Sequence, residues 1–296
     1  MYKSGFVAII GRPNVGKSTL LNEIIGEKLS IISSTAQTTR NTIKGIYTTS
    51  DAQIVFLDTP GLHKPKNELG AFMNKESINS LKEVDAIIWI VDVNEEFGKG
   101  DEYVASLLKD IDVPLILCFN KIDLIEDESK AKLNEDSFKN ACESKKVSFI
   151  SAKSKTGIEN LIEDIISLLD EGPKYYDDDQ ITDSIERFIV SELIREKIFY
   201  LTKDEIPHSV AVEIEDMVEK EDGVEIYACI VCERESQKKI LVGSGASMIK
   251  KIKQYSKRDI KKLLNTNVYL EIFVKVDKDW RNNKTSLSRL GYKNRG

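Results

Sequence analysis

Short apolar runs alternate with segments of helical periodicity between residues 6 and 169 of the chain. Most of the runs are continuously hydrophobic, as expected for parallel strands that are covered on both faces. The segments between them repeat apolar residues at every third or fourth position, which is typical of amphipathic helices. This alternation predicts an α/β fold with a doubly wound, mostly parallel sheet, whose functional residues lie at the carboxyl ends of the strands. Strands are expected at residues 6–10, 42–49, 53–57, 85–93, 114–119 and 147–150, and helices at 17–25, 101–109, 127–145, 157–169 and within 62–83.

A different pattern follows residues 171–182, EGPKYYDDDQIT, whose Pro, Gly and acidic run predict a linker. We therefore divide the chain into a first domain at 1–172, a linker at 173–182 and a second domain at 183–296. The second domain is predicted to be a small α+β fold of order α-β-β-α-α-β. Its expected helices are 184–202, 247–254 and 257–264, and its expected strands are 209–215, 224–233 (with 240–242 as an extension) and 268–276.

The composition is that of a globular protein with substantial cores. The chain has 296 residues, of which 41% are apolar, and this length suits one large or two ordinary domains. No apolar run approaches the ~20 residues of a membrane span, and the N-terminus enters the first expected strand too soon for a signal peptide. The sequence therefore predicts a cytoplasmic protein without a transmembrane segment.

The four cysteines are too few for a disulfide scaffold in a chain of this length. Cys229 and Cys232 form a CxxC pair, for which a redox or zinc site is the alternative interpretation. There is no second pair, however, and the two residues fall in a strand-like run, where their side chains would face opposite sides of a sheet. We expect buried structural thiols.

Residues 11–19, GRPNVGKST, lie between the first expected strand and the first expected helix. They meet the phosphate-loop pattern GxxxxGK followed by Ser or Thr, in the strand–loop–helix context that the motif requires. The glycines let the backbone approach phosphate oxygens, Lys17 would place its charge on the β- and γ-phosphates, and Ser18 would offer its hydroxyl to Mg²⁺. A glycine-rich turn with a surface lysine is the alternative, which the context disfavours. The candidate nucleotide-binding residues here are Gly11, Asn14, Val15, Gly16, Lys17, Ser18 and Thr19.

The sequence DTPG at residues 58–61 follows another expected strand directly. Asp58 would hold the water shell of Mg²⁺, and Gly61 would donate its backbone N–H to a γ-phosphate. Because such contacts require a triphosphate, the segment that follows is expected to act as a switch. An ordinary turn is the alternative interpretation of DTPG alone. For a metal-bound hydroxyl from the preceding loop the candidates are Thr38, Thr39 and Thr42, of which we favour Thr39. The predicted metal ligands are therefore Ser18, Thr39 and Asp58. The predicted catalytic residues are Lys17, Thr39 and Gly61.

The sequence NKID at residues 120–123 follows the strand expected at 114–119. The Asp123 carboxylate would accept both N1–H and the 2-amino group of guanine, which adenine does not offer, so the motif predicts selection of guanine. Asn120 would brace this loop against the phosphate loop, and Lys121 would lie along the base. An Asn/Asp-rich turn is the alternative. The sequence SAK follows the next strand, where the Ala152 N–H would donate to guanine O6, so Ser151, Ala152 and Lys153 complete the candidate site.

The second domain carries a local excess of positive charge in a chain whose net charge is −6. Residues 234–262 hold ten basic residues and two acids, which suggests an anionic partner. The order of elements resembles a type II KH domain, a module that clamps about four nucleotides of RNA with a GxxG loop, here expected between a strand and a helix. The corresponding segment here, GSGA, has Ala246 in place of the second glycine and Ser244 in place of a lysine that is common in this loop. The alternative to an RNA site is a basic helix face that is merely solvated. The candidate RNA-binding residues are Gly243, Ser244, Gly245, Ala246, Lys250, Lys251 and Lys253.

Taken together, GRPNVGKST, QTTRN, DTPGLHKP, NKID and SAK, followed by the KH-like domain, resemble the Era family of bacterial GTPases. The resemblance covers nearly the whole chain and implies GTP, GDP and Mg²⁺ as ligands. It also implies a GTP-hydrolysing switch that binds the 3′ region of small-subunit ribosomal RNA and assists assembly of the 30S subunit. Further implications are a K⁺ ion near Asn14 and a peripheral contact with the inner face of the cell membrane, for which the sequence shows no anchor.

The residue after DTPG bears on the rate of hydrolysis. Ras-type GTPases have a glutamine there that positions the attacking water, whereas this chain has Leu62, which cannot hydrogen-bond to water. Gln37 is the only glutamine nearby, and nothing in the sequence argues that it substitutes. We therefore expect slow intrinsic hydrolysis.

Two other interpretations of the whole chain stay open: an RNA-binding protein that uses GTP only as a structural ligand, and a GTPase whose second domain binds protein.

Overall fold

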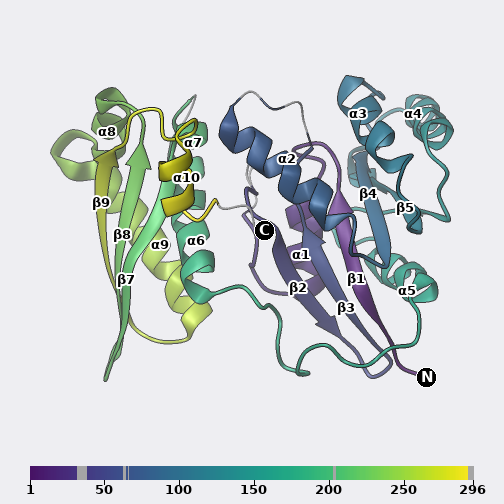
Figure 1. Cartoon of the computed structure of the whole chain (residues 1–296), viewed down its shortest axis with the longest axis horizontal. Helices are drawn as coiled ribbons and strands as arrows, with labels where there is room; N and C mark the ends of the chain where they lie inside the picture. The colour runs from purple at the N-terminus through teal and green to yellow at the C-terminus, as the bar shows by residue number, and fades with distance from the viewer. Residues whose placement is uncertain (32–38, 63–64, 66, 203–204, 293–296) are drawn as a thin grey trace. The chain divides into compact units, whose positions relative to one another are not determined.

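The computed structural model describes the chain except for residues 32–38, 63–64, 66, 203–204 and 293–296 (Figure 1). The described residues form two compact units, which we treat separately. The first covers most of residues 1–183, and the second covers residues 184 onward together with residues 67–72.

The first unit is built on a six-stranded sheet of order β2-β3-β1-β4-β5-β6. Every neighbouring pair is parallel except β2 and β3, which form an antiparallel pair. The prediction of a doubly wound, mostly parallel sheet is therefore confirmed. The strands are β1 (Lys3–Ile10), β2 (Ile43–Thr48), β3 (Ala52–Asp58), β4 (Ala86–Asp92), β5 (Leu115–Asn120) and β6 (Lys146–Phe149).

Helices connect these strands and cover the sheet, with α1 behind it and α2 in front of it in the view of Figure 1. On one face, alternate residues of β1, β4 and β5 pack with α3 and α4 around Trp89 and Phe138, whose rings meet edge to face at 5.7 Å. Local signals set the helix ends: Asp127 caps the N-terminus of α4 with its side chain, and Gly26 ends α1 with φ +79°. The helices are α1 (Lys17–Ile25), α2 (Glu68–Ser80), α3 (Lys99–Leu108), α4 (Glu128–Ala141), α5 (Ile158–Leu168) and the short 3-10 helix η1 (Ile122–Leu124).

Parallel pairing brings the ends of three strands to one edge of this sheet. The phosphate loop follows β1, Asp58 ends the adjacent β3, and Asn120 ends β5 on the other side of β4. Loops that are separated by up to a hundred residues in sequence therefore meet in space, as expected for a doubly wound sheet.

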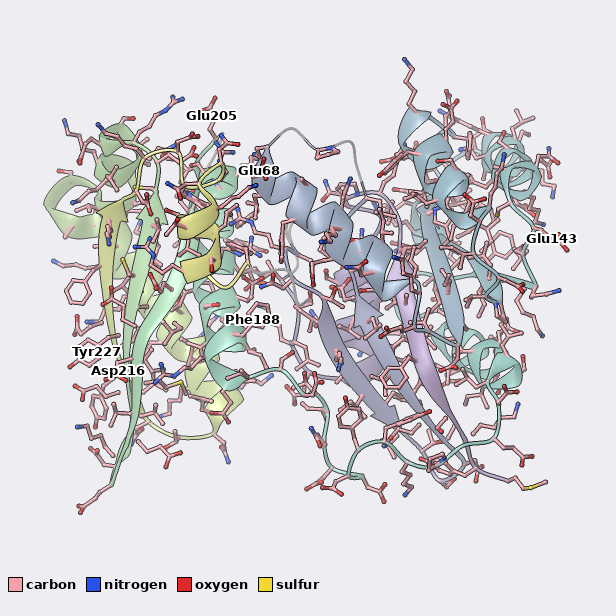
Figure 2. All side chains as sticks on the ribbon, viewed as in Figure 1. Glu68, Glu143, Phe188, Glu205, Asp216 and Tyr227 are labelled. Atoms are coloured by element: carbon pink, nitrogen blue, oxygen red, sulfur yellow. The ribbon has the colours of Figure 1, made fainter. Side chains whose placement is uncertain are left out.

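The second unit contains a three-stranded sheet of order β7-β8-β9. Strands β7 (Ala211–Lys220) and β8 (Gly223–Cys232) form the expected antiparallel pair, with a bulge between Ile214 and Asp216. Just beyond the bulge, Asp216 faces Tyr227 across the pair, and both are labelled in Figure 2. The last strand, β9 (Val268–Val276), runs parallel to β8.

The helices of the second unit differ from the sequence prediction in several details. Residues 240–242, expected to extend a strand, end helix α8, and residues 247–264, expected as two helices, form the single helix α9. Ser209, expected to begin a strand, ends the short helix α7. A short run such as ILV fits a strand or a buried helical segment equally well, so periodicity alone did not distinguish them. The helices are α6 (Glu186–Leu201), α7 (Ile206–Ser209), α8 (Glu235–Val242), α9 (Ser247–Leu264), α10 (Lys284–Arg289), which was not predicted, and the 3-10 helix η2 (Ser244–Ala246).

The thiols of the CxxC pair, Cys229 and Cys232, are buried, as we expected. All four cysteines are free; Cys118, Cys229 and Cys232 are buried and Cys142 is half-buried. Burial raises the pKa of Cys229 to about 11 and also raises the pKa of Cys232. Among the described helices, none combines the length and the hydrophobicity that crossing a bilayer requires.

Candidate nucleotide and RNA sites

The phosphate loop joins β1 to α1 and has a backbone that glycine adopts most easily. Gly11 has φ +152° and Gly16 has φ +106°. A Cβ atom on Gly11 would lie 2.3 Å from a carbonyl oxygen of β4, and one on Gly16 would lie 2.2 Å from Asn120 Nδ2. Both positions therefore require glycine for close packing as well as for conformation. Between them, Asn14 is exposed and has φ +67°.

Lys17 begins α1, and its ammonium group lies inside the phosphate loop. Nζ donates to the carbonyl oxygens of Gly11 at 3.1 Å and Arg12 at 2.7 Å, and the residue is only 6% exposed. Burial lowers the pKa of Lys17 to about 8, although the nearby Asp58 carboxylate acts in the opposite direction. A cation fixed in this loop is well placed to meet phosphate oxygens. Thr19, in the same helical turn, is half-buried.

Asp58 is fully buried at the end of β3 and receives three hydroxyl groups on one oxygen. Oδ2 accepts hydrogen bonds from Ser30 Oγ at 2.7 Å, Ser18 Oγ at 2.8 Å and Thr39 Oγ1 at 3.3 Å. The hydroxyl oxygens of Ser18 and Thr39 are also 2.9 Å apart. Burial raises the pKa of Asp58, while the hydroxyl donors and the Lys17 cation act in the opposite direction. The structure therefore brings together the three residues that the sequence suggested as metal ligands.

The arrangement around Asp58 fits Mg²⁺, which prefers oxygen donors. Ser18, Thr39 and Asp58 supply two hydroxyls and a carboxylate. Asp58 Oδ1 is buried and has no hydrogen-bond partner in the described part of the chain. Because an unsatisfied buried oxygen is costly, it indicates a site for a ligand outside the protein chain.

Thr42, the other threonine candidate that the structure describes, has a different partner. Thr42 Oγ1 is 3.2 Å from Ser80 Oγ at the end of α2. Thr38 lies outside the described residues. Of the two candidate threonines that the structure describes, only Thr39 reaches the Asp58 carboxylate.

Sequence reasoning missed two buried residues beside Asp58. Ser30 makes the shortest of the three hydrogen bonds to Asp58. Asn22 on α1 in turn binds the backbone of Ser30 through its side-chain amide. Their signal in the sequence is an uncharged polar residue within each of the mostly apolar stretches LLNEII and LSII. Polar residues in such stretches are buried with their neighbours and need a partner there.

The residues after Asp58 are closely packed on the phosphate loop. A Cβ atom on Gly61 would lie 3.0 Å from the backbone nitrogen of Pro13. Leu62 is fully buried in the core of the first unit, and its N–H lies 3.3 Å from the Gly11 carbonyl oxygen. Its side chain therefore has no access to an attacking water. Gln37 lies outside the described residues.

Asn120 links three loops through its buried amide. Nδ2 donates to the Val15 carbonyl oxygen at 2.8 Å, which is the brace to the phosphate loop that we expected. Oδ1 accepts from the Ala152 N–H at 2.9 Å, a contact that the sequence did not suggest. The Ala152 N–H, which we expected to donate to guanine O6, thus donates to Asn120 in this structure. Ser151 is buried beside it and supports its own loop, since Oγ accepts from Ser154 N–H at 3.1 Å.

Lys121 has φ +65° and pairs with a carboxylate at the end of β4. Its Nζ lies 2.7 Å from Asp92 Oδ2, and Asn94 binds the other Asp92 oxygen at 3.0 Å through its backbone N–H. Asp123, in η1, and Lys153 are exposed. The structure therefore brings Asp123 to the same strand end as Lys121 with an accessible carboxylate.

The GSGA segment lies between helices α8 and α9, not between a strand and a helix as we expected. Its backbone has a positive φ at three positions: Gly243 has φ +74°, Gly245 has φ +56° and Ala246 has φ +61°. Ser244 is exposed at the start of η2.

The predicted basic residues follow this loop on α9. Lys250 and Lys251 are exposed in its first two turns. Lys253 Nζ instead pairs with Glu271 Oε1 of β9 at 2.7 Å. Two of the three lysines are thus presented to solvent beside the GSGA loop.

Two protein-family models match the chain. Residues 6–121 match a family described as 50S ribosome-binding GTPase, and residues 205–281 match the KH domain family. The first match spans the loops around Lys17, Asp58 and Asn120, and the second contains the GSGA segment.

Two solved structures resemble nearly the whole chain. One is a crystal structure of Era in complex with MgGDPNP and nucleotides 1506–1542 of 16S ribosomal RNA, with 36% identity, a TM-score of 0.95, and coverage of 99% of both chains. The other is a variant of Aquifex aeolicus Era bound to GDP·AlF4⁻, with 36% identity, a TM-score of 0.94, and coverage of 98% of this chain and 99% of that chain.

Proposed function

Because the chain belongs to the Era family of GTPases, we propose that it is a Mg²⁺-dependent switch that hydrolyses GTP to GDP and phosphate. In this proposal it binds the 3′ region of small-subunit ribosomal RNA and assists assembly of the 30S subunit. The observation that carries the proposal is the meeting of Ser18, Thr39 and Asp58 beside a buried Lys17 at the end of β1. The similarity to Era over 99% of both chains supports the RNA-binding half.

The phosphate loop binds the β- and γ-phosphates through its backbone N–H groups and the Lys17 cation. Around the base, Asp123 pairs with guanine N1–H and the 2-amino group, and Lys121 lies along the ring, held by Asp92. Ala152 and its neighbours Ser151 and Lys153 close the base site, with Asn120 fixing their loop on Val15.

Ser18, Thr39 and Asp58 are the residues that would hold Mg²⁺, which when bound neutralises charge on the phosphate oxygens. Gly61 offers its backbone N–H to the γ-phosphate, and a larger residue there would press on Pro13. Loss of the γ-phosphate removes that contact, so the segment after Gly61 reports which nucleotide is bound.

Hydrolysis by the protein alone is slow in this proposal. The buried Leu62 cannot orient water, and positioning of the phosphates by Lys17, Thr39 and Gly61 is what remains. A K⁺ ion near Asn14 would add positive charge at the phosphates. Equal hydrolysis rates in Na⁺ and K⁺ buffers would count against this last element.

In the second unit, RNA backbone approaches the GSGA turn, where residues 243–246 carry little side-chain bulk. Lys250 and Lys251 supply positive charge beside that turn, and Lys253 does so to the extent that Glu271 releases it. Phosphate contacts of this type release counterions, so RNA affinity should fall steeply as salt is raised. A second unit that binds protein instead would show no affinity for ribosomal RNA that salt could weaken.

The decisive experiment measures Mg²⁺-dependent release of phosphate from GTP with and without 30S subunits. We expect slow release by the protein alone, faster release with subunits, and none from Lys17→Ala. Lys109→Ala, which removes an exposed cation at the end of α3, is the matched control and should behave as wild type. GTP binding without phosphate release under any condition would favour an RNA-binding module that uses GTP as a structural ligand.

We also propose a cytoplasmic location with a peripheral contact at the inner face of the cell membrane. Fractionation of cells, followed by salt extraction of the membrane pellet, tests this part separately. Protein that stays wholly in the supernatant at low salt would contradict the membrane contact.

A further inference from the structure

The hydrogen bonds around Asp58 are distributed unevenly between its two oxygens. Oδ2 accepts from three hydroxyls, whereas the buried Oδ1 has no partner among the described residues. A carboxylate offers about four acceptor positions over two oxygens. The protein therefore turns one oxygen toward its own donors and leaves the other available to a ligand.

The three donors differ in what holds them. Ser18 lies on the phosphate loop and Thr39 on the loop that precedes β2, and both are themselves predicted metal ligands. Ser30 is not a predicted ligand, and it is the closest donor, at 2.7 Å. The Ser30 hydroxyl donates to the Asp58 carboxylate and has no proposed contact with the metal.

Ser30 is fixed by the fold independently of any nucleotide. Asn22 Nδ2 donates to the Ser30 carbonyl oxygen at 2.7 Å, and Asn22 Oδ1 accepts from the Ser30 N–H at 2.9 Å and the Leu29 N–H at 3.0 Å. Ser30 is 2% exposed and Asn22 is 7% exposed. Asn22 follows Ser18 by four residues on α1, so one helical turn separates the phosphate loop from the support of Ser30.

We infer that Ser30 is a positioning residue that orients the Asp58 carboxylate for Mg²⁺, an inference that rests on the proposed function of the phosphate-loop site. By binding Oδ2, the Ser30 hydroxyl sets the rotation of the carboxylate and directs Oδ1 toward the water shell of the metal. Without this donor, the carboxylate loses its shortest hydrogen bond and one constraint on its orientation. The nucleotide contacts of the phosphate loop and of Asn120 do not involve Ser30.

The test is the Mg²⁺ dependence of GDP release from the full chain. A fluorescent N-methylanthraniloyl GDP is displaced by unlabelled GDP over a series of Mg²⁺ concentrations and in excess chelator. The variants are Ser30→Ala, which removes the donor, and Ser30→Cys, which keeps the side-chain size with a weaker donor. Ser148→Ala is the matched control, because Ser148 is also buried and donates to a carboxylate, Asp164 Oδ2, at 3.0 Å.

We expect Ser30→Ala to raise the half-saturating Mg²⁺ concentration about tenfold, as the loss of one hydrogen bond to a charged group implies. Ser30→Cys should shift it in the same direction by less, and Ser148→Ala should not shift it. Release in chelator should be the same in all four proteins, because the nucleotide contacts are intact.

An unchanged half-saturating Mg²⁺ concentration in Ser30→Ala overturns the inference. The inference also fails if Ser30→Ala accelerates GDP release by the same factor in chelator as in Mg²⁺. If Ser30→Ala does not fold, an unchanged Mg²⁺ dependence of Ser30→Cys overturns it. Failure of the proposed function has a different signature: the wild type and Ser148→Ala would then both fail to bind GDP, or release it without regard to Mg²⁺.

Discussion

Ala246 holds a left-handed backbone conformation that is unfavourable for a residue with a Cβ atom. Its φ is +61° and its ψ is +27°, at the junction between η2 and α9. The cost for an L-residue in this region is roughly 1–2 kcal/mol. The GSGA segment therefore keeps the shape of a glycine turn even where the residue is alanine.

Ala246→Gly should raise the stability of the second unit. Glycine adopts the same conformation without steric cost, and we expect a gain of about 1 kcal/mol in the free energy of unfolding. Urea unfolding followed by circular dichroism measures it. Ser247→Gly is the control, because Ser247 has helical φ −66° and should lose stability on the same substitution. A loss of stability in Ala246→Gly would show that its conformation carries no strain.

The thiols of the CxxC pair should be unreactive in the folded protein. Burial raises the pKa of Cys229 to about 11, so only about 0.1% of it is thiolate at pH 8. The reactive thiolate forms only as the pH rises toward that value, so labelling should accelerate with pH. We expect Ellman's reagent to label Cys229 and Cys232 slowly at pH 8 and rapidly after unfolding in guanidinium chloride. Fast labelling of the native protein would revive a redox or metal-binding interpretation.

At the scale of elements, strand ends rather than helices carry the candidate site. The functional loops begin where β1, β3, β5 and β6 end, and the buried Asn120 at the end of β5 binds the loops after β1 and β6. A buried amide with both of its groups engaged fixes the spacing between the phosphate loop and the base-binding loop. The position of the guanine relative to the phosphates depends on that spacing.

Asn120→Ala should weaken GDP binding by roughly a hundredfold, because it removes two hydrogen bonds and leaves Val15 O and Ala152 N–H without them. Fluorescence titration with labelled GDP measures the affinity. Gln237→Ala is the control, since Gln237 is also a buried amide and its Oε1 accepts hydrogen bonds from two backbone N–H groups, but within the second unit. The brace would be unimportant for binding if both variants retained wild-type affinity.

At the scale of the whole molecule, residues 173–182, which we expected to form a linker, are part of the first unit. Gln53 of β3 binds the backbone of Tyr175 and Tyr176, with its Oε1 accepting from their N–H groups at 2.7 and 3.0 Å. The Ile46 N–H of β2 donates to the Ile181 carbonyl oxygen at 2.8 Å. Although its composition is typical of a linker, this stretch adds hydrogen bonds along the edge of the sheet.

A fragment of residues 1–183 should therefore be more stable than one of residues 1–172. With about 1 kcal/mol for each hydrogen bond that the shorter fragment lacks, we expect its Tm to be lower by roughly 10 °C. Thermal unfolding by circular dichroism compares the two. Gln53→Ala in the longer fragment is a second comparison and should account for part of the difference. Equal Tm values would place the boundary of the first domain at 172.

The sequence by itself determined the fold class and the location of the nucleotide site. Alternating apolar runs and helical segments specify a parallel sheet, and GRPNVGKST, DTPG and NKID follow its strands directly. These signals are local: each depends on residues that are neighbours in the chain, and strand ends necessarily meet at one edge of the sheet. The expectation that Ser18, Thr39 and Asp58 lie together as metal ligands followed from them, whereas the order of the strands in the sheet did not.

Only the tertiary structure showed what holds these residues in place. Ser30 and Asn22 support Asp58, and Asn120 binds Ala152, across separations that no periodicity encodes. The assignment of residues 240–242 to α8 also required packing, because a short apolar run suits either element. A buried polar side chain is explained only by the partner that satisfies it, and the folded chain alone decides which partner is within reach.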